Sequence, residues 1–150
     1  QRYTPSLLQQ AIVENTQDSD QVLVLATTTL FTYPVLMQID RRQAFSEVDS
    51  SIYAIATSHL SYEELTDPNL ILPVIVQQYL DTVIQDIQSK QPAMIVIEKP
   101  RAYLYDFLVT QSIIDEYVLR NYILLEDREG YIIFLRQDAH SAGEREPNRN

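Results

Sequence analysis

The sequence predicts one α/β domain over residues 1–136, a three-layer Rossmann-like sandwich whose sheet is mostly parallel. Two apolar runs rich in β-branched residues, 21–26 (QVLVLA) and 93–97 (AMIVI), are typical of strands that are covered on both faces. Amphipathic stretches of helical periodicity lie between them, and strands that alternate with helices imply right-handed crossovers. Two further apolar runs around a polar turn predict an antiparallel hairpin at the end of the domain.

In the first half of the chain, Thr4 is a suitable N-cap and Pro5 suits the first turn, so a helix is expected to begin there. The strand over 21–26 then leads into a threonine loop and a second helix, which we expect to end near Arg41 and Arg42. Residues 51–56 (SIYAIA) are expected to form a short strand.

In the second half, apolar residues recur at spacings of three and four and predict a long amphipathic helix that has Lys90 in its last turn and is stopped by Pro92. They are Leu72, Ile75, Val76, Tyr79, Leu80, Val83, Ile84 and Ile87. After the strand over 93–97, a further helix is expected over about 103–120. The hairpin strands are expected over 122–125 and 131–135. Residues 137–150 are polar, and we expect them to form a disordered tail.

Charge and composition exclude several classes of function. Eleven Lys and Arg residues against 21 Asp and Glu give a net charge of −10, which argues against a nucleic-acid partner because phosphate contacts need a basic face. The same charge disfavours docking on anionic lipid through a polybasic patch. Two glycines are too few for a phosphate-cradling loop, and the absence of cysteine excludes thiolate chemistry and disulfides.

Polar side chains follow the two predicted central strands, at the carboxyl ends where open α/β sheets bind ligands. They are Thr27, Thr28 and Thr29 after the first strand, and Glu98 and Arg101 after the second. The hydroxyls could hold an anion or a sugar, Glu98 could accept a proton, and Arg101 could bind a phosphate. In the alternative interpretation, the threonines cap a helix and Glu98 pairs with a neighbouring cation in solvent.

Arg41 and Arg42 are the single adjacent pair of basic residues in this acidic chain. They could bind an anionic headgroup or a pyrophosphate. They could equally neutralise the C-terminus of the helix that they end.

Histidine gives little sign of a catalytic or metal site. His59 has Glu63 four residues later, a spacing too common to indicate a metal site, and His140 falls in the predicted tail. We therefore expect no metal, no cofactor and no catalytic residue in this chain.

Several short motifs follow one another over residues 20–136. They are 22–27 (VLVLAT), Phe31, 33–35 (YPV), Arg41 and Arg42, 92–98 (PAMIVIE), Tyr122, Gly130, Tyr131 and Arg136. Together they resemble the soluble extracytoplasmic domain that follows the transmembrane helices of bacterial multi-pass membrane glycosyltransferases of the GT-C type. The chain lacks the Asn-Tyr pair and the tryptophans expected in that group.

The resemblance implies a non-catalytic domain, because the catalytic carboxylates of that family lie in loops of its membrane portion. It implies a domain on the extracytoplasmic, periplasmic face that supports or recognises a lipid-linked sugar or its acceptor. Its partner would be the membrane portion of the same polypeptide, with spanning helices before Gln1.

Two other hypotheses remain open. The chain could be a free-standing small α/β hydrolase or transferase, in the cytoplasm, that uses Thr27, Thr28, Thr29 and Glu98. It could instead be a regulatory or assembly domain that forms a homo-oligomer through the C-terminal hairpin, with the strand over 131–135 as the exposed edge.

Overall fold

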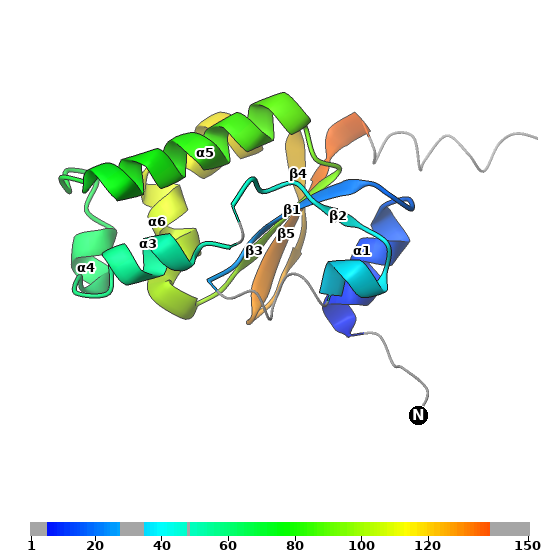
Figure 1. Ribbon diagram of the computed structural model, residues 1–150, viewed down its shortest axis with the longest axis horizontal. Helices are drawn as coiled ribbons and strands as arrows, with labels where there is room; N and C mark the ends of the chain where they lie inside the picture. The colour runs from blue at the N-terminus through cyan, green and yellow to red at the C-terminus, as the bar shows by residue number, and fades with distance from the viewer. Residues whose placement is uncertain (1–5, 28–34, 48, 139–150) are drawn as a thin grey trace, which may run out of the picture.

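The computed structural model describes residues 6–27, 35–47 and 49–138, which form a mixed five-stranded sheet with helices packed on it (Figure 1). The strands are β1 (Gln21–Leu25), β2 (Arg42–Gln43), β3 (Met94–Glu98), β4 (Tyr122–Asp127) and β5 (Tyr131–Arg136), in the spatial order β2-β1-β3-β5-β4. Strand β1 is parallel to β2 and β3, whereas β5 is antiparallel to β3 and β4.

The helices are α1 (Leu7–Asn15), α3 (Ser51–Ala56), α4 (Tyr62–Leu65), α5 (Val74–Lys90) and α6 (Leu104–Thr110). A helical turn covers residues 35–38, η1 (Arg101–Tyr103) is a 3₁₀ turn, and η2 (Ile114–Val118) is a π-helical turn. Within the described ranges, no helix has both the length and the apolar composition that a membrane span requires.

The first described helix begins at a capping box. The Ser6 hydroxyl accepts from the Gln9 backbone N–H at 3.2 Å, and the Gln9 side chain accepts from the Ser6 N–H at 2.9 Å. Each bond satisfies a donor that has no partner in the first turn of a helix. The predicted start at Thr4 and Pro5 lies outside the described residues.

The two faces of the sheet bury separate apolar clusters because side chains alternate along each strand. Leu23 and Leu25 pack with α3, α5 and α6, whereas Val22 and Val24 pack with α1 and Leu36. Strands β1 and β3 are therefore covered on both faces, as their continuous apolar sequences indicate.

The prediction of a mixed α/β chain with a parallel centre and a C-terminal hairpin is confirmed. Strands β1 and β3 match the runs over 21–26 and 93–97, and Lys90 lies in the last turn of α5 as expected. Strand β5 lies between β3 and β4, however, so the predicted exposed edge over 131–135 is wrong. The free edge of the hairpin is β4.

The predicted strand over 51–56 is wrong, because these residues form helix α3. Ser50, Tyr53 and Thr57 are buried at spacings of three and four, which is a helical period. The Tyr53 ring lies 4.9 Å from the Phe107 ring of α6, centroid to centroid. Packing of one aromatic face thus favours a helix in a segment whose β-branched residues suggested a strand.

The single helix predicted over 103–120 is interrupted. Helix α6 ends at Thr110, and Ser112 adopts a left-handed φ of 62° before the π-helical turn begins. No glycine or proline marks this break in the sequence.

Strand β2 is short, and a side chain extends its pairing with β1. The Gln43 amide oxygen accepts from the Val24 N–H at 2.9 Å, and its amide nitrogen donates to the Val24 carbonyl at 2.9 Å. One side chain therefore satisfies the donor and the acceptor that a longer β2 would have paired. The sequence pattern predicts no strand at Arg42 and Gln43, where only the end of a helix is expected.

Candidate functional site

The first candidate site is the rim formed by the carboxyl ends of the adjacent parallel strands β1 and β3. The Glu98 carboxylate accepts from the backbone N–H of Thr27 at 2.7 Å and from the Thr27 hydroxyl at 3.1 Å. Arg101 Nε lies 3.9 Å from the other Glu98 oxygen. The structure thus brings together Thr27, Glu98 and Arg101, whereas Thr28 and Thr29 lie outside the described residues.

The rim carboxylate is engaged inside the protein. The Glu98 side chain is only 10% exposed, and both of its oxygens have partners within the chain. Hydrogen bonds to a charged acceptor are stronger than neutral ones, so Glu98 fastens the segment after β1 to the end of β3. Arg101 is 60% exposed and is the part of this rim that faces solvent.

Two buried tyrosines form hydrogen bonds with residues next to the rim. The Tyr53 hydroxyl donates to the carbonyl of Ala102 at 2.8 Å, and the Tyr79 hydroxyl lies 2.7 Å from the Ser50 hydroxyl. Burial raises the pKa of both phenols above the ordinary value, so they stay protonated at neutral pH. Ser50 in turn donates its backbone N–H to Ala26 at 2.7 Å. These groups position the rim and do not provide a general base.

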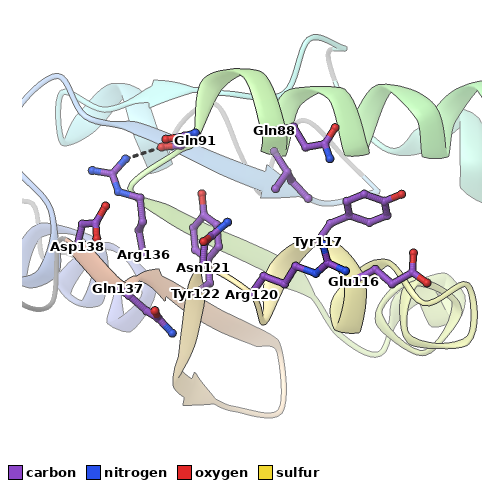
Figure 2. A pocket seen from close by; sticks show the side chains of 11 residues that line it. Gln88, Gln91, Glu116, Tyr117, Arg120, Asn121, Tyr122, Arg136, Gln137 and Asp138 are labelled. Carbon is purple, nitrogen blue, oxygen red and sulfur yellow. Dashed lines mark hydrogen bonds between the residues drawn. The ribbon is translucent and has the colours of Figure 1, made fainter.

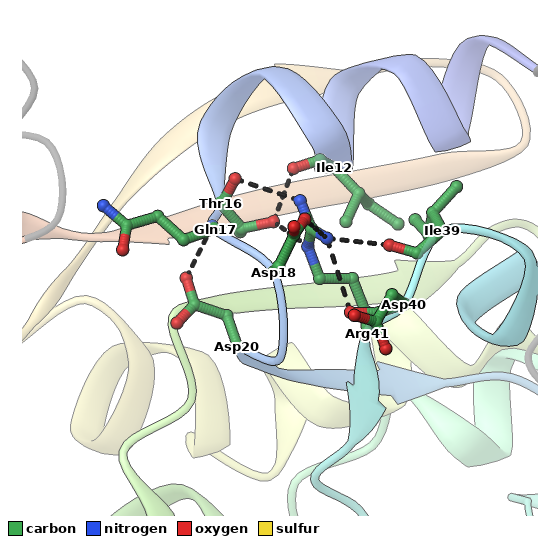
Figure 3. A network of polar contacts seen from close by, with 8 residues as sticks. All are labelled: Ile12, Thr16, Gln17, Asp18, Asp20, Ile39, Asp40 and Arg41. Atoms are coloured by element: carbon green, nitrogen blue, oxygen red, sulfur yellow. Dashed lines mark hydrogen bonds and ion pairs between the residues drawn. The ribbon is translucent and has the colours of Figure 1, made fainter.

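Arg41 and Arg42 occupy different environments. The Arg41 guanidinium is 3% exposed and donates from Nε to the Thr16 hydroxyl at 2.7 Å and from Nη2 to the Thr16 carbonyl at 3.1 Å (Figure 3). Nη1 donates to the Ile39 carbonyl at 2.7 Å and to Asp18 at 3.1 Å. Arg41 therefore ties the C-cap of α1 to the segment before β2, whereas Arg42 is exposed.

A polar pocket lies at the opposite end of the sheet from the rim. Its volume is about 330 Å³, and it is bounded by the C-terminal end of α5, the η2 turn, the start of β4 and the end of β5. Figure 2 shows Arg136 beside Gln91 on one side, and Arg120 beside Tyr117 and Glu116 on the other. Gln88, Asn121, Tyr122 and Asp138 also line it.

The pocket carries charges of both signs that are not paired with each other. Among the ion pairs of the described residues, none involves Arg120, Arg136, Glu116 or Asp138. Arg136 donates from Nη1 to the Gln91 carbonyl, and its buried Nε has no partner among the residues described. Arg120, Glu116 and Asp138 thus line this hollow without an ion pair among the described residues, and Arg136 uses one of its donors on Gln91.

Hydrogen bonds hold the floor of the pocket in place. The Tyr122 hydroxyl donates to the Pro92 carbonyl at 2.6 Å, and burial raises the pKa of Tyr122 to about 12, so it is neutral. The Gln137 N–H donates to the Asn121 carbonyl at 2.9 Å. These two bonds join the start of β4 to the segment before β3 and to the end of the described chain.

Sequence reasoning missed this pocket because its residues come from three distant segments. Tyr122 and Arg136 stood out in the sequence only as parts of the expected closing hairpin, which gave no sign of a pocket. His59 lies exposed between α3 and α4, and His140 lies outside the described residues. In the part of the chain that the structure describes, no three His, Asp or Glu side chains are placed to hold a metal ion.

Comparisons of this chain with protein-family models, with curated proteins and with solved structures gave no match.

Proposed function

We propose that this chain is a non-catalytic binding domain of a membrane glycosyltransferase-like protein, and that it recognises a lipid-linked sugar or its acceptor. In this proposal the fold is a three-layer Rossmann-like sandwich on the extracytoplasmic side of a membrane. The partner is the membrane portion of the same polypeptide, where the family places its chemistry. The resemblance over residues 20–136 motivates the assignment.

The observation that carries the proposal is the polar pocket with its unpaired charges. Arginine binds phosphate through a planar, multiply donating group, and the pocket holds Arg120 and Arg136. The amides of Gln88 and Asn121 can donate to and accept from sugar hydroxyls. The Tyr117 ring offers an apolar face for the C–H side of a pyranose. This mixture fits a glycosyl phosphate better than an apolar ligand.

In this proposal the domain binds and orients the sugar substrate or its acceptor, and it does not catalyse glycosyl transfer. The rim carboxylate Glu98 is occupied by Thr27, whereas the pocket groups are open to a ligand. A sugar phosphate held here would be positioned for chemistry performed by another part of the protein.

Nuclear magnetic resonance titration tests the binding. We expect glucose 1-phosphate to shift the amide signals of residues 117–121 and 136–138, and to bind more tightly than inorganic phosphate or methyl glucoside. Arg120→Ala is expected to weaken binding about tenfold, which corresponds to ~1.4 kcal/mol. Arg128→Ala is the matched control, because Arg128 lies in the β4–β5 turn and pairs with Glu126. Absence of shifts, or shifts confined to residues 98–101, would overturn the assignment.

The attachment to a membrane is tested separately on the full-length gene product. We expect several membrane-spanning segments before Gln1 and recovery of the protein in the membrane fraction. A product without such segments would refute this part of the proposal and leave the binding result standing.

The rim supports a second candidate, a small hydrolase or transferase. Thr27 places a hydroxyl 3.1 Å from the Glu98 carboxylate, the arrangement of a nucleophile beside a base. Hydrolysis of p-nitrophenyl acetate or phosphate that is abolished by Thr27→Val would support it. Turnover that is equal in Thr27→Val and the parent chain would exclude it.

A further inference from the structure

One end of the molecule presents large apolar side chains to solvent. We call this surface the apolar end; it consists of Ile55, Tyr62, Ile71, Val74, Ile75 and Tyr103. Five of these residues lie on α3, on α4, at the start of α5 and on η1, and Ile71 lies just before α5. Figure 1 shows α3, α4 and the start of α5 grouped at one end of the fold. The polar pocket lies at the other end of α5, so the two surfaces are distinct.

Three side chains of the apolar end are exposed over more than 70% of their surface. Ile71 is 92% exposed, Ile55 is 74% exposed and Val74 is 73% exposed. Two tyrosines from different elements meet here, since the rings of Tyr62 and Tyr103 lie 5.0 Å apart, edge to face. Single exposed apolar residues are ordinary, but a group of them at one place marks an interaction surface.

Exposed acidic side chains outnumber basic ones around the apolar end. No lysine or arginine occurs from residue 43 to residue 89, a stretch that includes α3, α4 and nearly all of α5. Glu63, Glu64 and Asp67 are exposed on and after α4, and none of them forms an ion pair within the described part of the chain. Arg101 lies in the same turn as Tyr103, is 60% exposed and has its Nε 3.9 Å from Glu98, so it is the one cation beside this surface in the part of the chain that the structure describes.

We propose that the apolar end binds an amphipathic helix whose apolar stripe is flanked by lysine and arginine. Burial of the aliphatic side chains would supply affinity, and the exposed carboxylates of Glu63, Glu64 and Asp67 would meet the flanking cations. Val74 and Ile75 in the first turn of α5, with Ile71 just before it, give the partner a row of aliphatic contacts.

The charge separates this partner from two others. An anionic membrane would be repelled by the carboxylates on and after α4. A second copy would bring the same carboxylates against themselves, and like charges across an interface disfavour association. A cationic helix is the partner that satisfies both the apolar and the acidic character of the surface.

The test uses two synthetic 18-residue helices that share a leucine stripe and differ in having lysine or glutamate beside it. We expect the lysine helix to bind, to bind more weakly as salt is raised, and to shift amide signals of α3, α4 and the start of α5. Ile71→Ser combined with Val74→Ser is expected to weaken this binding at least about tenfold. Glu63→Gln combined with Glu64→Gln is expected to weaken it and to flatten its salt dependence.

Leu124→Ser is the matched control, since Leu124 is 53% exposed on β4, outside the apolar end, and its replacement is expected to leave binding unchanged. Equal binding of the lysine and glutamate helices, or binding unaffected by the Ile71 and Val74 replacements, would overturn the proposal. Dimerisation of the chain, or adsorption to phosphatidylcholine vesicles, that is lost on those same replacements would also overturn it, because another partner would then occupy the surface. The pocket titration is an independent measurement, so failure of one proposal leaves the other intact.

Discussion

The Glu98 carboxylate at the end of β3 accepts both the backbone N–H and the hydroxyl of Thr27, just beyond the end of the neighbouring strand β1. A backbone N–H that is buried without an acceptor costs about 1–3 kcal/mol. The pair therefore contributes to holding the two central strands in register at their carboxyl ends.

Replacement of Glu98 tests that contribution. Glu98→Ala is expected to lower the free energy of unfolding by ~2 kcal/mol, because the Thr27 N–H loses its acceptor. Glu98→Gln keeps an acceptor oxygen and is expected to lose less. Urea denaturation monitored by circular dichroism measures both variants, and an alanine variant as stable as the parent chain would contradict the assignment.

Arg41 is expected to be the most sensitive basic residue of the chain for stability. Arg41→Ala removes donors from the Thr16 and Ile39 carbonyls and from Asp18, and we expect a loss of ~3 kcal/mol. Arg41→Lys is expected to recover little of this lost stability, because one ammonium group cannot make the several hydrogen bonds of the planar guanidinium. Arg42→Ala, at an exposed position, is expected to change stability by no more than about 0.5 kcal/mol. Equal losses in the Arg41 and Arg42 alanine variants would refute this difference.

Glu47 is expected to lower stability at neutral pH. Burial, followed by the negative charges of Asp86 and Asp49, raises the pKa of Glu47 above its ordinary value of 4.5. The folded chain thus holds this proton more tightly than the unfolded chain, so folding is favoured below pH 4.5 and disfavoured once the pH exceeds the raised pKa. Glu47→Gln is expected to raise the melting temperature at pH 7, by the equivalent of no more than about 0.5 kcal/mol. The gain should vanish at pH 4, and a gain of equal size at both pH values would contradict the explanation.

Gln43 is expected to protect the Val24 amide from hydrogen exchange. Its side chain supplies both hydrogen bonds to Val24 at the place where β2 stops, so Gln43→Ala should speed exchange of that amide and cost ~2 kcal/mol. Gln77→Ala, at an exposed position on α5, is the control and should leave Val24 exchange unchanged. Unaltered hydrogen exchange of the Val24 amide in the Gln43 variant would show that the Gln43 side chain does not protect this part of β1.

The fold was predictable where one short-range pattern dominated. Continuous β-branched runs gave β1 and β3, and the spacing of three and four gave α5. The prediction of a strand over residues 51–56 was wrong because packing of Tyr53 on Phe107 favours a helix there. These two residues are more than fifty positions apart, so no local sequence pattern records their contact. The prediction of one continuous helix over 103–120 was also wrong. No local sequence signal marks Ser112 as a residue that adopts the left-handed region and breaks the helix.

Of the two candidate sites, one could be predicted from the sequence and the other could not. The rim was predictable because the topology of parallel strands places their carboxyl ends side by side, and Thr27, Glu98 and Arg101 do meet there. The polar pocket was not predictable, because it depends on how the end of α5, the η2 turn and the end of β5 converge. Each segment alone reads as an ordinary polar surface.

Helix α5 has a polar pocket at its last turns and an apolar surface at its first. Its 17 residues give it a length of about 25 Å. A sugar phosphate and a helical partner bound at those two places would be kept apart by a rigid strut anchored on the sheet. The two proposed ligands would then bind about one helix length apart on the same domain, without touching each other.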